Sequence, residues 1–447
     1  MRLLNKIKSN SLLKKSLADT NYYLISQVAA KLLTILVIPF LARVVTVEDF
    51  GSYDAFLLYS SFLLVFATLG IDSGIGVFIV ESKGKEHELS FYYTISLILG
   101  SLTIVILFAL GSFVQSIYPI IPALLFKWIF INLFFSFISY TAFNFLRWMG
   151  KSKVAAIVTF FSTTLGVLLG VLLILILNSS NIVHFIIGLI IGNLVCAVIC
   201  LILTRQYFRL LLLDEFKSKI GDIFKVSLPF LPNYLVNNLL LLSDRFLILH
   251  FLNPVAYGHY SIIARISQIP AFGIQVINKG FLPVLFQNHN TDEGRSFNRK
   301  IFHLYLLLIL PLLLFFMMAD KMLVQLFAGK QYVDVAYLVP SVMLSVIFFG
   351  TMGFNGFGFS IRRKTLQITI ITIVSVILNV SISLLLIKKI ELSAISIAIM
   401  ITAAITSFAY TYFSERLFKI GYNQAVMIVV YAISTLIALI YTLYYHH

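Results

Sequence analysis

The sequence predicts an all-α membrane protein that crosses the bilayer many times. Of its 447 residues, 60% are hydrophobic and only 11% are charged, and the mean hydropathy is +0.99. One soluble core cannot hide this much apolar surface from water, so lipid must be part of the solvent. Apolar runs of about 20 residues recur along the whole chain, and a helix of that length crosses a hydrocarbon layer of roughly 30 Å.

These apolar runs predict thirteen membrane-spanning helices. They cover residues 20–43, 52–80, 90–113, 119–147, 154–177, 182–205, 223–251, 255–285, 300–319, 334–359, 365–388, 392–414 and 422–444. Several runs exceed the minimum length, which indicates that the helices tilt or project beyond the hydrocarbon.

Basic residues in the connections indicate the orientation, because lysine and arginine collect on the cytoplasmic side of short loops. The amino terminus and every second connection are rich in them, whereas the opposite connections hold only Arg43, Lys321, Lys330, Lys388 and Lys389. We therefore expect a multi-pass protein of the bacterial cytoplasmic (inner) membrane with a cytoplasmic amino terminus. The net charge of +15 then reflects topology, and we expect no nucleic-acid partner.

The predicted helices group into two parallel six-helix lobes and one additional helix. The expected division is a cytoplasmic basic segment at 1–19, an N-lobe at 20–205, a cytoplasmic linker at 206–222, a C-lobe at 223–416 and an additional transmembrane helix at 422–445. The linker mixes charges with leucines, as in interfacial segments. We expect the thirteenth helix to be peripheral, because it follows two complete lobes and carries no intramembrane charge.

A short motif recurs near the start of each lobe. It comprises an aromatic residue, a glycine and a tyrosine, and the two copies are 207 residues apart: Phe50, Gly51 and Tyr53, then Tyr257, Gly258 and Tyr260. Six helices per lobe give both copies the same orientation, so the motif predicts a parallel repeat about an axis along the membrane normal.

Charged residues inside the predicted spans are the main functional signal. We count two anions, Asp72 and Asp244, and five cations, Lys31, Lys127, Arg245, Arg265 and Lys279. A cation that faces lipid near the midplane costs roughly 3 kcal/mol, so these groups need water, partners or one another. Snorkelling to the interface is an equal alternative for Lys127 and Lys279, which lie nearer to helix ends.

Helical spacing places polar residues on stripes. One stripe in the eighth helix contains Ser261, Arg265, Gln268, Gln275 and Lys279. Further stripes pair Asn237 with Asp244 and Asn238 with Arg245 in the seventh helix, and join Gln27 to Lys31 in the first. They predict a central cationic cavity, although neutral residues of this kind also hydrogen-bond helices to each other.

A confined excess of positive charge selects anionic cargo, most simply phosphate, diphosphate or carboxylate. We expect no cofactor and no metal, because Cys196 and Cys200 lack a four-ligand set and are better explained as small buried residues. Proton or sodium coupling stays open, with Asp72 and Asp244 as its candidates.

Three stretches resemble a known family in their order and spacing. They are residues 38–56 with Pro39, Arg43, Phe50, Gly51 and Tyr53; residues 150–153 with Gly150, Lys151 and Lys153; and residues 243–270 with Asp244, Arg245, Gly258, Tyr260, Ala264 and Arg265. There the chain resembles polysaccharide-biosynthesis flippases of the multidrug, oligosaccharidyl-lipid and polysaccharide exporter superfamily, in particular Wzx-type O-antigen carriers. The resemblance covers most of the chain.

The resemblance implies a V-shaped pair of lobes that opens to each membrane face in turn. Its cargo would be an undecaprenyl-diphosphate-linked oligosaccharide, an O-antigen or capsule repeat unit of the kind used for lipopolysaccharide, with Lys31, Arg245 and Arg265 meeting the diphosphate or acidic sugars. Expected partners are this lipid-linked oligosaccharide and membrane lipids, and further candidates are a polysaccharide polymerase and chain-length proteins. Lipid II flippases carry an arginine–carboxylate pair in helix 1, whereas Lys31 lies between Ala30 and Leu32.

Two other functions compete with a flippase. A multidrug exporter of the same superfamily would extrude cations, which favours an acidic or aromatic cavity rather than a basic one. A membrane-embedded polysaccharide polymerase or glycosyltransferase would need paired carboxylates in an outer loop. Asp320 and Asp334 are the only candidates, and we interpret both as interfacial charges. We therefore expect a transporter and not an enzyme.

Overall fold

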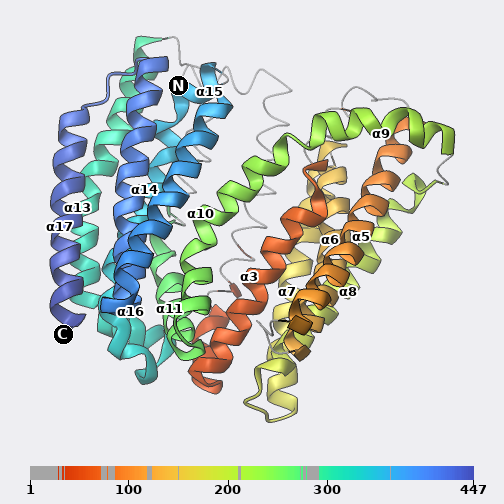
Figure 1. Cartoon of the computed structure of the whole chain (residues 1–447), viewed down its shortest axis with the longest axis horizontal. Helices are drawn as coiled ribbons and strands as arrows, with labels where there is room; N and C mark the ends of the chain where they lie inside the picture. Colours follow the sequence, from red (N-terminus) through yellow and green to blue (C-terminus); the bar gives the residue numbers. More distant parts are fainter. Residues whose placement is uncertain are drawn as a thin grey trace. The chain divides into compact units, whose positions relative to one another are not determined.

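The structure is a computed structural model of the chain (Figure 1). It describes residues 29, 33–34, 36–71, 78, 86–117, 123–149, 151–209, 213–271, 273–274, 278, 291–362 and 364–446. Every regular element within these residues is helical, which confirms the predicted fold class.

Nine helices in the described part of the chain are long and apolar enough to cross a membrane. The predicted spans 365–388 and 392–414 form one of them, α16 (Thr365–Leu417), in which Ile390 and Glu391 leave the helical conformation. The span 20–43 lies largely outside the described residues. Two other predicted spans, 223–251 and 255–285, are not among the nine. Polar residues lower the hydropathy of α10 (Phe230–Phe251) in the first, and α11 (Pro254–Ser267) in the second has only 14 residues.

The chain forms two compact units. Unit 1 comprises Met1–Val45 and Tyr53–Leu235, and unit 2 comprises Thr46–Ser52 and Val236–His447. The first turns of α3 (Val47–Thr68) therefore belong to unit 2 and the rest of this helix to unit 1. The second boundary between the units, after Leu235, falls inside α10. The predicted linker lies earlier in the chain, and there the structure has the short helix η1 (Arg205–Tyr207) and α9 (Leu213–Ser227).

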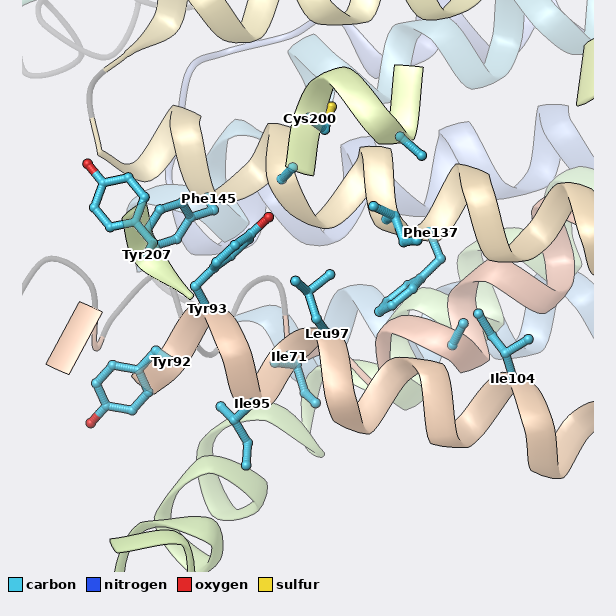
Figure 2. Packing of buried hydrophobic residues seen from close by; sticks show 14 of the residues in the cluster. Ile71, Tyr92, Tyr93, Ile95, Leu97, Ile104, Phe137, Phe145, Cys200 and Tyr207 are labelled. Atoms are coloured by element: carbon cyan, nitrogen blue, oxygen red, sulfur yellow. The ribbon is translucent and has the colours of Figure 1, made fainter. Parts of the chain in front are cut away.

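Unit 1 contains most of α3 and four long helices: α5 (Glu86–Ile117), α6 (Ala123–Trp148), α7 (Ser152–Ile176) and α8 (Ile182–Thr204). Tyr93 of α5 lies at the centre of its core (Figure 2). The Tyr93 hydroxyl is 2.7 Å from Oγ1 of Thr204, and its ring centroid is 4.5 Å from that of Phe145. A buried tyrosine needs such a hydroxyl partner, because hydrocarbon offers none.

Two further features complete this core. Cys196 and Cys200 are buried in it, as predicted for small apolar residues. The amphipathic helix α9 packs Phe216, Ile220 and Ile223 against it, at spacings of four and three residues that place them on one helical face.

Four glycines let α7 and α8 pack backbone against backbone. Gly166 and Gly170 lie on α7, and Gly188 and Gly192 lie on α8, each pair four residues apart. A Cβ atom on Gly188 would overlap the backbone of Gly170, and one on Gly192 would overlap Gly166. This is the small-residue packing by which membrane helices gain dispersion energy without a hydrophobic driving force.

Gly188→Ala should destabilise the protein by about 1–3 kcal/mol, because the new methyl group must push two backbones apart. Thermal unfolding of the purified protein in detergent measures the loss. Gly221→Ala is the matched control, since nothing lies within 4 Å of a Cβ atom at this helical position. Equal melting temperatures for both variants would show that the glycine contact does not hold α7 to α8.

Unit 2 contains α11, α16 and the following further elements: α13 (Asp292–Ala328), η2 (Lys330–Leu338), α14 (Val339–Asn355), α15 (Phe357–Arg362) and α17 (Gln424–His446). Helix α17 is the predicted thirteenth helix, and one of its faces packs against the rest of unit 2, while its peripheral role in transport stays a prediction. It packs on α13, α14, α16 and η2, and Met427, Ala438 and Thr442 are fully buried.

Hydroxyl groups fasten α17 to its neighbours. The Tyr431 hydroxyl lies 3.1 Å from Thr351 of α14 and 3.0 Å from Ser407 of α16, and these two hydroxyls also bond to each other. A second pair joins Thr442 to Ser341 at 2.7 Å. The Tyr431 hydroxyl in particular would otherwise be buried in an apolar environment without these partners, which is costly.

Deleting residues 420–447 should lower the amount of protein in the membrane and abolish function with it, because this removes the buried face of α17 and the Tyr431 hydroxyl that bonds to both α14 and α16. Tyr431→Phe isolates this effect and should cost about 1 kcal/mol in thermal stability. Tyr444→Phe is its control, as Tyr444 is 75% exposed. A truncated protein present at the normal level would contradict the structural role of α17.

Candidate functional site

Seven of the predicted site residues lie on α10 and α11 within unit 2: Asn237, Asn238, Asp244, Arg245, Ser261, Arg265 and Gln268. A tight turn joins these helices. The Asn253 side chain caps α11 by accepting the N–H of Ala256 at 2.8 Å, and Pro254 opens the helix with its preset φ. The chain thus reverses direction within a few residues and lays α11 back along α10.

Asp244 is a buried carboxylate that accepts hydrogen bonds from two neutral groups. The Tyr260 hydroxyl donates to its Oδ2 at 2.6 Å, and the Arg245 amide donates to its Oδ1 at 2.8 Å. Asp244 is 8% exposed and Tyr260 is fully buried. The hydrogen bond from Tyr260 therefore joins α11 to α10 next to the neighbouring residues Asp244 and Arg245.

Arg265 is half-buried on α11, and an aromatic ring fixes its guanidinium group. Its Cζ lies 5.4 Å from the ring centroid of Phe50, which belongs to the first turns of α3. Phe50 is fully buried and packs edge-on against Tyr332 of η2, whose ring in turn contacts His259. A cation over an aromatic face is stabilised by the ring quadrupole, more so where water is excluded.

The neutral residues of the predicted lining occupy different environments. Asn237 and Asn238 are half-buried on α10, and Gln268 is exposed at the end of α11. Ser261 is fully buried, and its hydroxyl donates to the Tyr257 carbonyl at 2.8 Å, four residues earlier. The assignment of Ser261 to a hydrated lining is therefore corrected: it is a packing residue of α11.

Several predicted site residues lie elsewhere. Lys127 is exposed near the start of α6 in unit 1, as expected for a lysine that snorkels from a helix end. The α10–α11 residues belong to unit 2. The remaining five lie outside the described residues: Gln27, Lys31, Asp72, Gln275 and Lys279.

The environment of three polar residues was not predicted from the sequence. Asp54 of α3 is buried in a predicted span, so it should have been counted among the intramembrane anions. Asp320, interpreted from the sequence as an interfacial charge, is buried within the protein, with 3% exposure, and accepts a hydrogen bond from the Tyr441 hydroxyl at 2.7 Å. Tyr260, the partner of Asp244, carried a signal in the repeated motif, but hydropathy does not identify which tyrosine meets a carboxylate.

Arg245 of α10 and Arg265 of α11 are the cations of this site. A guanidinium group is a planar fork of N–H donors that can match two oxygens of one phosphate. Among the described residues there is no cluster of three or more histidine, cysteine, aspartate or glutamate side chains that would hold a metal ion.

Comparisons with known proteins identify the fold. The structure is similar to an inward-facing multidrug resistance MATE family transporter of the MOP superfamily, with a TM-score of 0.67 and 14% identity over 85% of this chain and 94% of that one. The outward-facing conformation of such a transporter gives a TM-score of 0.61 at 14% identity, over 89% of this chain and 95% of that one.

A third similar structure is a MOP superfamily transporter from Pyrococcus furiosus, in which reverse polarity of the binding pocket suggests a different function. Its TM-score is 0.62 at 15% identity, over 90% of this chain and 95% of that one. No curated protein sequence matches the chain. The model of one family, described as polysaccharide biosynthesis protein, matches residues 16–289. The chain therefore belongs to the polysaccharide biosynthesis protein family and has the fold of MOP-superfamily transporters.

Proposed function

We propose that the protein is a flippase that moves an undecaprenyl-diphosphate-linked oligosaccharide, such as an O-antigen or capsule repeat unit, from the cytoplasmic to the outer leaflet. The membership of the polysaccharide biosynthesis family supports a surface glycan as cargo. The proposal includes an amino terminus in the cytoplasm of a bacterial cell, which the distribution of basic residues favours.

The observation that carries the proposal is the position of Arg265. Its guanidinium group is half-buried within a predicted membrane span and is held over the Phe50 ring. An arginine at that depth is costly unless it faces water or a partner, and retaining one is typical of a functional position. A diphosphate supplies the anionic oxygens that such a fork binds in a bidentate manner.

Multidrug export is the second candidate, because the similar solved structures include multidrug resistance transporters. The two functions differ in the charge of their cargo. A site that contains Arg245 and Arg265 would repel organic cations and attract diphosphates. Cargo charge therefore separates the candidates, and substitutions at Arg265 act in opposite directions on them.

Arg265→Ala should reduce surface-polysaccharide export by about tenfold or more without lowering the amount of protein in the membrane, since it removes charge-assisted hydrogen bonds to the diphosphate. Arg265→Glu should be worse because it repels the anion, and Arg265→Lys should retain part of the activity. Export is measured in a host that lacks its own carrier, beside an immunoblot of the membrane fraction.

A structural role for Arg265 predicts a different pattern. If Arg265 served to neutralise Asp244, Arg265→Ala would leave a buried carboxylate uncompensated and lower the protein level. Adding Asp244→Asn would then restore both level and export. That rescue would remove Arg265 from the cargo site, whereas a double variant that is well folded and still inactive supports the proposal.

A further inference from the structure

The two copies of the repeated motif meet each other within unit 2. A Cβ atom on Gly51 would lie 2.9 Å from the Pro254 carbonyl oxygen and 3.0 Å from the Gly258 nitrogen. In return, a Cβ atom on Gly258 would overlap the carbonyl of Val47. Val47 and Pro254 are themselves 207 residues apart, so the contact is reciprocal between equivalent positions of the repeat. We refer to this contact of Thr46–Ser52 with the start of α11 as the glycine junction.

The glycine junction delivers one side chain to the candidate site. Phe50 directly precedes Gly51, and the close approach that the glycines permit brings its ring to the guanidinium group of Arg265. The repeat is not symmetric in this respect. The position equivalent to Arg265 is Leu58, which lies 207 residues earlier and is buried. Only one copy of the repeat therefore places a cation at this level.

We propose that Phe50 is a positioning residue for cargo, and that the affinity of Arg265 for a lipid-linked diphosphate depends on the docked glycine junction. A ring in contact with the guanidinium group restrains the position of that group. The diphosphate then meets a fork that is already positioned, which lowers the ordering cost of binding. When Thr46–Ser52 separates from the start of α11, the Phe50 ring leaves Arg265 and the diphosphate is released.

The coupling must act in both directions. If the docked junction strengthens diphosphate binding, then diphosphate binding strengthens the junction by the same factor. This inference rests on the proposed function, because it takes Arg265 as the residue that binds the diphosphate.

The test uses farnesyl diphosphate as a short lipid diphosphate, farnesol as the uncharged control, and purified full-length protein in detergent. Phe50→Leu should weaken farnesyl diphosphate binding about five- to thirtyfold, the range for a desolvated cation–π contact, and leave farnesol binding unchanged. Phe50→Tyr should keep the wild-type affinity for farnesyl diphosphate, since tyrosine retains the ring. Phe56→Leu is the matched control, because Phe56 is equally buried on the same helix.

Equal diphosphate affinities for Phe50→Leu and Phe56→Leu, with a clear loss in Arg265→Ala, would overturn the inference and leave the proposed function intact. A wild-type protein that binds farnesol and farnesyl diphosphate equally would instead overturn the proposed function and the inference with it.

A second measurement needs no variant. Hydrogen–deuterium exchange of the wild-type amides at 50–56 should slow by a similar factor when farnesyl diphosphate is added and should not respond to farnesol. Exchange that is unchanged by bound diphosphate would contradict the coupling.

Discussion

Hydrocarbon offers no hydrogen-bond partner, and this constraint determines how the helices are joined. Each buried polar side chain must be satisfied by its own helix, by a neighbouring helix or by cargo. Ser261 uses the first solution by bonding to the carbonyl four residues earlier. Tyr431 uses the second by joining α14 and α16 to α17. For Arg265, held over Phe50 in a span expected to cross the membrane, we propose cargo as a further partner.

The two units meet this constraint with different chemistry in corresponding helix pairs. In unit 1, α7 and α8 pack through glycines and need few polar contacts. In unit 2, the two halves of α16 are joined by hydroxyl groups, with the Thr406 hydroxyl donating to Ser375 at 2.6 Å. Glycine contacts rely on dispersion between close backbones, whereas hydroxyl pairs are directional. The two units therefore use two kinds of helix contact.

The helices were predictable from the sequence because hydropathy measures the quantity that the bilayer selects. The repeated motif was also informative, since Gly51 and Gly258 lie in contact. The integration of α17 was not predictable, because serine, threonine and tyrosine hardly change hydropathy while their hydroxyls decide which helices touch. The burial of Asp320 and Ser261 was not predicted for a related reason. Helical spacing identifies the residues on a common face but not the helices that pack against that face.

The central claim is that the protein carries an anionic lipid-linked glycan. Its most direct test is reconstitution into liposomes with a fluorescent undecaprenyl-diphosphate-linked sugar, followed by quenching from outside with a membrane-impermeant reductant. Wild-type protein should expose the labelled lipid of the inner leaflet to the quencher faster than Arg265→Ala protein or protein-free liposomes do. Wild-type rates equal to those of protein-free liposomes, together with transport of an organic cation such as ethidium, would contradict the account.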